Sequence, residues 1–169
     1  SGGLNQYAAF NNNPVNYVDP DGLDTYLVTV GMGVPSSQVT AIENAFRNSP
    51  YFNPGADQVQ VDYVARASLL GKVLARYSDK RAWVHIGHGG FNLLFLDNRP
   101  GQTAPDTNLS GDSCNTGKYR SDSLGSLPQG GFLPDAKLMF LSCRSGVSLN
   151  GIPSFAQAAA NYFGRPALG

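Results

Sequence analysis

The chain has 169 residues, a length that fits one compact domain with a short additional segment. Its 12 Lys and Arg residues balance 12 Asp and Glu residues, which argues against bulk electrostatic binding to nucleic acid or to an anionic membrane. Hydrophobic residues make up 41% of the chain, enough for a buried core, but no apolar run approaches the roughly 18 residues of a membrane helix. Two cysteines exclude a disulfide scaffold, and the first residues lack the basic and apolar regions of a signal peptide.

Residues 1–23 differ in composition from the rest of the chain. They contain no Lys or Arg, and turn-forming residues fill positions 11–14 and 19–22. The segment has no helical periodicity and few apolar side chains to bury. Its composition predicts a linker or the end of another domain.

From Asp24 onward, strand and helix patterns alternate along the chain. We expect strands at 26–30, 59–64, 83–86 and 138–141, a short strand or hairpin arm within 91–96, and the beginning of a last strand at 165–168. Helices are expected after a cap at Ser36 or Ser37 (with Val39, Ile42, Ala45 and Phe46 on one face), over 69–77, and over 155–163 with Gly164 at the end; residues 97–135 read mostly as loop. This alternation predicts an α/β fold whose mostly parallel central sheet is flanked by helices.

Two motifs stand where apolar strands end: Gly87-His88-Gly89-Gly90 and Ser142-Cys143-Arg144-Ser145-Gly146. In parallel sheets, ligand chemistry lies beyond the carboxyl ends of the strands. A thiol that faces a histidine there has what nucleophilic catalysis needs, since the base generates thiolate and glycine N–H groups can hold an oxyanion. A lone cysteine is more often a buried structural residue. The pairing of Cys143 with a glycine-flanked His88 favours the catalytic interpretation.

Other polar residues have a plain structural interpretation beside a functional one. His85 alternates with apolar neighbours and is expected to be a packed strand histidine, and two histidines without a cysteine or carboxylate cluster predict no zinc site. Cys114 follows no apolar strand and is expected to be a solvent-exposed loop thiol. Asp62 and Asp97 would orient His88, line a pocket or lie at the surface. Arg144 would favour the thiolate form of Cys143 or be a surface arginine.

Residues 83–90 and 138–146 resemble the His-Gly and Cys blocks of the caspase-like cysteine peptidases, most closely their CHAT branch. His88 and Cys143 are 55 positions apart, near the roughly 50 of caspases. The resemblance covers about residues 24–168 in element order. It implies a caspase-like three-layer sandwich, with His88 as base, Cys143 as nucleophile and the N–H groups of Gly89 and Cys143 as oxyanion donors. The strands that this family has after its last helix are absent before Gly169, which implies a shortened or trimmed domain.

A second resemblance covers residues 4–23. The pattern Asn13-Pro14-Val15-Asn16, two residues, then Asp19-Pro20-Asp21-Gly22-Leu23 is similar to the end of the core of RHS-repeat proteins. In that family the core is a shell that encloses a variable toxin and cuts itself after the Leu. The resemblance implies cleavage between Leu23 and Asp24, with Asp19 as a candidate member of the cutting site. It also implies secretion by a specialised bacterial delivery system, action in the target-cell cytoplasm, and a cognate immunity protein.

The function expected from these patterns is that of a cysteine endopeptidase toxin that acts on target-cell proteins through a Cys-His dyad. The alternatives are another thiol acyl transfer, such as deamidation, and a catalytically silent caspase-like binding domain. No cofactor, metal, nucleic acid or membrane partner is implied. Asp62, Asp106, Asp112 and Asp122 are candidates for an acidic pocket that would favour a basic substrate residue.

Overall fold

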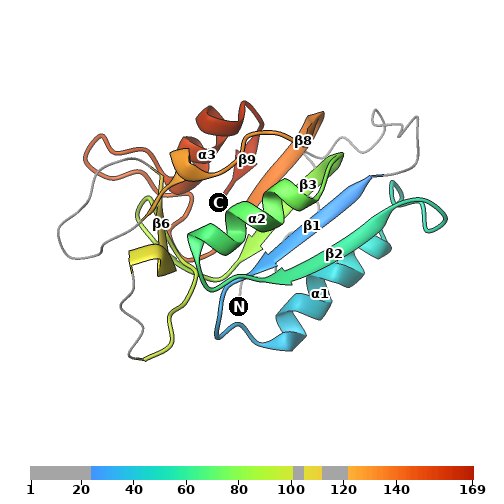
Figure 1. The fold of residues 1–169 in the computed structure, drawn as a ribbon, viewed down its shortest axis with the longest axis horizontal. Helices are drawn as coiled ribbons and strands as arrows, with labels where there is room; N and C mark the ends of the chain where they lie inside the picture. Colours follow the sequence, from blue (N-terminus) through green and yellow to red (C-terminus); the bar gives the residue numbers. More distant parts are fainter. Residues whose placement is uncertain (1–23, 101–104, 112–121) are drawn as a thin grey trace.

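The computed structural model describes residues 24–100, 105–111 and 122–169. Leu23 and Asp19 of the expected cleavage site, as well as Cys114 and Asp112, lie outside the described residues. The predicted α/β fold with a mostly parallel central sheet is confirmed (Figure 1). Its strands are β1 (Thr25–Val30), β2 (Gln58–Tyr63), β3 (Lys80–Ile86), β8 (Phe132–Leu141) and β9 (Ala167–Leu168).

The five strands of this sheet lie in the order β2-β1-β3-β8-β9, and each pairs in parallel with its neighbours. The chain therefore moves outward from β1 to β2, and then returns to the other side of β1 to form β3. Doubly wound sheets bind ligands outside the carboxyl ends of their strands at such a reversal, which in this sheet lies between β1 and β3. The loops after Val30, Ile86 and Leu141 follow the carboxyl ends of the central strands, where ligand binding is expected.

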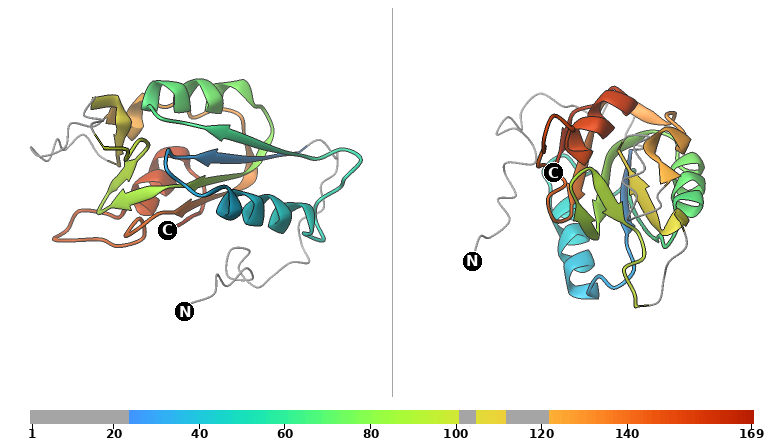
Figure 2. Two further views of the ribbon diagram at one scale, coloured as in Figure 1. Left: turned by 90° about the horizontal axis from the view of Figure 1, so that it is seen from below. Right: turned by 90° about the vertical axis from the view of Figure 1, so that its left-hand side faces the viewer.

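Three helices cover the sheet: α1 (Ser36–Arg47), α2 (Ala67–Arg76) and α3 (Phe155–Phe163). Val39 and Phe46 of α1 pack on one face of the sheet, and apolar side chains of α2 and α3 pack on the other. Figure 2 shows α1 and α2 on opposite sides of the strands, so the molecule has three layers. No helix within the described part of the chain is long and apolar enough to cross a membrane.

The predicted helix ends are confirmed at α3 and corrected at α1. Ser154 caps α3 by accepting a hydrogen bond from the backbone of Gln157 at 3.1 Å, and Gly164 ends the helix with φ 62°. Neither Ser36 nor Ser37 caps α1, because the helix begins at Ser36 and Pro35 occupies the capping position without a side-chain bond.

The segment 97–135, expected to be mostly loop, contributes more structure than its composition predicts. It contains β6 (Asn108–Ser110), β7 (Asp122–Ser123), two 3-10 turns and the first residues of β8. Together with β4 (His88–Gly90) and β5 (Leu93–Phe95), it forms a small sheet in the order β4-β5-β6-β7 beyond the carboxyl end of β3 (Figure 1). The buried leucines Leu94 of β5, Leu109 of β6 and Leu124, directly after β7, join this small sheet to the core.

Lys80, at the start of β3, is a fully buried lysine. By strand alternation Lys80 should share a face with Ala82 and Val84, which pack with α1. A register shift beside Arg81 turns Lys80 to the opposite face, toward α2. Its Nζ donates hydrogen bonds to the carbonyl oxygens of Leu74 at 2.9 Å, Tyr77 at 2.6 Å and Gly130 at 3.1 Å. Burial lowers the pKa of Lys80 to about 8, so the group is still an ammonium at neutral pH. The lysine thereby caps the end of α2 and joins it to the loop before β8.

Lys80→Met should lower the free energy of unfolding by about 2–4 kcal/mol, because it leaves three inward-facing carbonyl groups without their donor. Urea unfolding followed by circular dichroism measures this loss. Lys72→Met is the matched control, since Lys72 is an exposed lysine of α2. An equal effect of both substitutions would contradict the structural role of Lys80.

Candidate active site at the carboxyl ends of β3 and β8

The last residues of two neighbouring strands, Ile86 of β3 and Leu141 of β8, are paired in register. The backbone N–H of Gly87 donates to the carbonyl oxygen of Leu141 at 3.3 Å, so the two segments remain in contact as they leave the sheet. His88 and Cys143 each follow two residues beyond this pair, and both are exposed. The structure thus brings the two predicted motifs to the same edge of the sheet.

Gly87 and the β4–β5 hairpin determine where His88 lies. A Cβ atom at Gly87 would stand 2.9 Å from Nε2 of the buried His85, so a larger residue at this exit from β3 would displace that imidazole. His88 then begins β4 and pairs with Phe95 across an antiparallel hairpin. This pairing places His88 on a short strand of its own. The sequence had indicated only that His88 follows the end of β3.

Cys143 lies in a tight turn that Ser145 organises. The hydroxyl of the fully buried Ser145 lies 2.8 Å from the carbonyl oxygen of Phe140 and 2.9 Å from that of Ser142. Its own carbonyl accepts a hydrogen bond from the backbone of Ala156 in α3 at 3.0 Å. Ser145 therefore fixes the turn to both β8 and α3. Sequence reasoning gave Ser145 no role, although its place two residues after the cysteine in the motif was visible.

Gly89 is the point at which the two motifs meet. A Cβ atom there would lie 2.9 Å from the carbonyl oxygen of Cys143 and 2.9 Å from Cβ of Ser142. The backbone after His88 consequently packs directly against the backbone of the cysteine turn. This close approach agrees with a shared site to which Gly89 and Cys143 both contribute.

Arg144 contacts an aromatic ring and is not a simple surface charge. It adopts φ 59°, an unusual conformation for a side chain of its size, and its guanidinium lies over the ring of Phe91 at 4.8 Å. Phe91 belongs to the β4–β5 turn, so this cation–π contact ties the cysteine turn to the hairpin that carries His88. Next to it, the loop after Cys143 exposes the apolar side chains of Val147, Leu149 and Ile152.

His85 is a packed strand histidine, as predicted. It is fully buried, its Nδ1 lies 3.0 Å from the hydroxyl of Thr29, and that hydroxyl accepts the indole N–H of Trp83 at 2.8 Å. Burial lowers the pKa of His85 to about 4, so the imidazole is neutral at physiological pH. Its Nε2 has no hydrogen-bond partner among the described residues.

Other side chains engage Asp62, which was expected to orient His88, line a pocket or lie at the surface, and Asp106, a candidate for an acidic pocket. Asp62 accepts from Tyr77 at 2.9 Å and pairs with Arg76 at 3.3 Å, and Asp106 pairs with Arg66 at 3.4 Å.

Asp97 is buried instead of solvated, and Arg99 holds it with contacts of 2.7 and 2.9 Å. The Arg99 guanidinium lowers the pKa of Asp97. Asp122 lies on β7. These arrangements assign none of the acids to the dyad.

Within residues 24–100, 105–111 and 122–169, no group of three or more His, Cys, Asp or Glu side chains is placed to hold a metal ion. Searches against protein-family models, characterised proteins and solved structures found no match to this chain. The site is therefore interpreted from its own geometry.

Acidification should lower the free energy of unfolding, because the imidazole of His85 is buried in its neutral form. The folded-state pKa of about 4 lies below the ordinary 6.5, so the stabilisation is complete above pH 6.5 and is lost as the pH falls toward 4. Between pH 7 and pH 5 the protein should lose about 2 kcal/mol of unfolding free energy through this group. His85→Gln should remove this loss, whereas His88→Gln, at an exposed position, should keep it. Urea unfolding at the two pH values measures both, and identical pH dependence in the two variants would disprove the assignment.

Proposed function

We propose that this chain is the toxic effector domain of an RHS-type protein and acts as a cysteine endopeptidase. The observation that carries the proposal is the in-register pairing of Ile86 with Leu141, which brings His88 and Cys143 to one edge of the sheet. The packing of Gly89 against the cysteine turn supports the same conclusion. The resemblance of both motifs to caspase-like peptidases gives the reaction class and a caspase-like form of the three-layer fold.

In the proposed reaction His88 takes the proton of the Cys143 thiol, and the thiolate attacks the carbonyl carbon of a substrate peptide bond. The backbone N–H groups of Gly89 and Cys143 stabilise the oxyanion of the tetrahedral intermediate. The C–N bond then breaks, and the amine leaves with the proton from His88. Water attacks the remaining thioester and releases the carboxylic acid, which restores the thiol. The exposed apolar loop after Cys143 would contact substrate side chains.

The biological setting follows from the resemblance of residues 4–23 to the end of an RHS core. The shell would enclose the toxin and cut the chain after Leu23, in chemistry that involves aspartates such as Asp19. A bacterial delivery system would carry the effector to the target-cell cytoplasm, where proteins are its substrates. A cognate immunity protein would protect the producing cell.

A catalytically silent binding domain or a deamidase would share this fold and these residues. An electrophilic, thiol-reactive probe separates the silent domain, because an activated Cys143 should react far faster than a free cysteine in a peptide. Peptide-library profiling separates the two enzymes, since an endopeptidase yields new N-termini and a deamidase converts amides without cleavage.

Cys143→Ala and His88→Ala should each abolish toxicity in cells by at least a hundredfold in viable counts, because each removes one member of the dyad. Both proteins should stay folded, since both side chains are exposed beyond the strand ends. Viable-cell counts after induced expression, with melting curves of the purified variants, measure the two effects.

Cys114→Ser is the control for the other thiol and should leave toxicity unchanged. His85→Gln should cost far less activity than His88→Gln. Toxicity retained in a folded Cys143→Ala variant would sink the peptidase proposal, and equal losses at the two histidines would show that the base is wrongly assigned.

Processing at the boundary gives a separate prediction. In the longer protein, N-terminal sequencing of the toxin fragment should give Asp24 as its first residue, and Cys143→Ala should be cut as completely as the parent. A Cys143→Ala protein that is no longer cut would make the toxin its own processing protease. A fragment that begins past Tyr26 would remove the first residues of β1 and contradict the boundary.

A further inference from the structure

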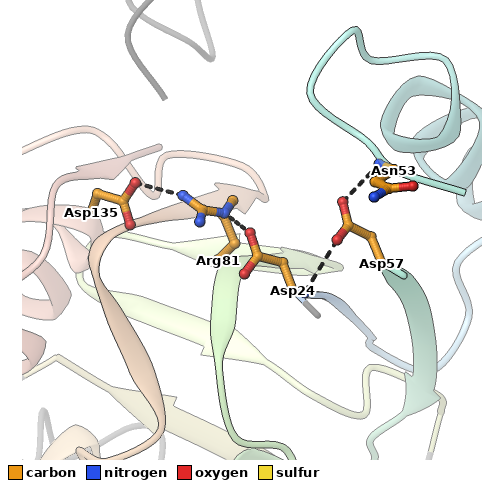
Figure 3. A network of polar contacts seen from close by, with 5 residues as sticks. All are labelled: Asp24, Asn53, Asp57, Arg81 and Asp135. Carbon is orange, nitrogen blue, oxygen red and sulfur yellow. Dashed lines mark hydrogen bonds and ion pairs between the residues drawn. The ribbon is translucent and has the colours of Figure 1, made fainter. Parts of the chain in front are cut away.

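Asp24, the residue after the proposed cut, is buried beside the amino end of β1. Its carbonyl oxygen accepts from the backbone of Gln58 at 3.0 Å, and the next N–H, that of Thr25, donates to the carbonyl oxygen of Asp79 at 3.0 Å. Its carboxylate forms an ion pair with Nε of Arg81 (Figure 3). These contacts fix Asp24 at one place in the sheet.

The backbone nitrogen of Asp24 has a different kind of partner. It donates to Oδ1 of the buried Asp57 side chain at 3.2 Å, not to the carbonyl of a neighbouring strand (Figure 3). The other carboxylate oxygen of Asp57 accepts from the backbone of Asn53 at 2.8 Å, which holds the side chain in position before β2. A buried carboxylate thus faces the nitrogen atom at which the proposed cut occurs.

Charged side chains surround the amino end of β1 (Figure 3). Figure 3 shows three carboxylates, those of Asp24, Asp57 and Asp135, and one guanidinium, that of Arg81, which also pairs with Asp135 at 2.5 Å. Buried carboxylates are stabilised by hydrogen-bond donors and by cations, and an ammonium group at the position of the Asp24 nitrogen would be both.

We infer that Asp57 is the binding site for the α-ammonium group that cleavage creates at Asp24. This inference rests on the proposed cut after Leu23. Hydrolysis breaks the Leu23–Asp24 C–N bond, adds the hydroxyl of water to the Leu23 carbonyl carbon, and gives a carboxylate on Leu23 and an ammonium on Asp24. The new ammonium keeps its hydrogen bond to Asp57 and converts that bond into an ion pair.

Cleavage at this bond therefore costs the central sheet none of its strand-to-strand hydrogen bonds. The N–H of Asp24 is engaged by a side chain, and the strand pairing begins with its carbonyl oxygen. The released domain gains an ion pair at the residue where β1 would otherwise fray. The cut end would then be locked into the fold as it separates from the shell.

The inference can be tested in the full 169-residue chain with an imposed cut. Residues 19–23 are replaced by Asp-Asp-Asp-Asp-Lys, so that enteropeptidase cleaves directly before Asp24. A second chain carries one extra Gly between this sequence and Asp24, which moves the new ammonium about 3.8 Å along the chain. The readouts are the acylation rate of the α-amino group at pH 7.5, measured by mass spectrometry with an N-hydroxysuccinimide ester, and the melting temperature before and after the cut.

An opposite charge at hydrogen-bond distance raises an amine's pKa, so the amine at Asp24 should be acylated about tenfold more slowly than that of the Gly-extended chain. The melting temperature should rise on cutting only where the chain begins with Asp24. Asp57→Asn should abolish both differences, whereas Asp62→Asn, which removes a carboxylate from the far end of β2, should keep them.

Equal acylation rates in the direct and Gly-extended chains would overturn the inference, even if Asp57→Asn failed to fold. Because the cut is imposed, this result is independent of the natural processing site. Sequencing a naturally processed toxin that begins elsewhere would refute the proposed cut, while a slow amine in the imposed-cut chain would still establish the Asp57 site.

Discussion

The parallel pairing of β3 with β8 is the constraint on which the candidate site depends. Side chains alternate between the two faces of a strand, so a slip of one residue would exchange the α1 face for the α2 and α3 face. It would also move Leu141 away from Ile86, and His88 and Cys143 would leave the sheet at different levels. Correct register at this one pair of strands is therefore a condition of both the core and the proposed dyad.

Polar residues of β3 help to specify its position in the sheet, because each reaches a partner on a neighbouring element. Lys80 reaches the carbonyl oxygens at the end of α2, Arg81 reaches Asp24 and Asp135, and His85 reaches the hydroxyl of Thr29. A shifted strand would leave these groups buried without partners, and this costs more than a misplaced apolar contact. The strand is thus fixed by polar contacts along its length as well as by apolar packing.

The sequence predicted those elements whose apolar pattern is long and regular. The strands around 26–30, 83–86 and 138–141 and all three helices are confirmed. The amino half of β8 was missed because Pro134 and Asp135 read as a loop. In the small sheet, the short strand expected within 91–96 is confirmed as β5, whereas β4, β6 and β7 have two or three residues each and carry no periodicity. The capping role of Lys80, the burial of Asp97 and the hydrogen bonds of Ser145 depend on partners distant in sequence, which no local pattern reveals. Both motif positions of the candidate site were found because each directly follows an apolar strand.

The geometry also bears on which chemistry cuts the chain. Asp24 lies at the amino end of β1, whereas Cys143 follows the carboxyl end of β8, and the strands run parallel (Figure 1). Six residues of β1 at about 3.3 Å each separate the two ends by about 20 Å. The bond before Asp24 cannot reach Cys143 of the same molecule unless β1 leaves the sheet, and β1 is buried along its whole length. The folded domain is therefore unable to cut this bond within the same molecule, so the proposed cleavage would come from another polypeptide or from the shell that the resemblance to RHS proteins implies.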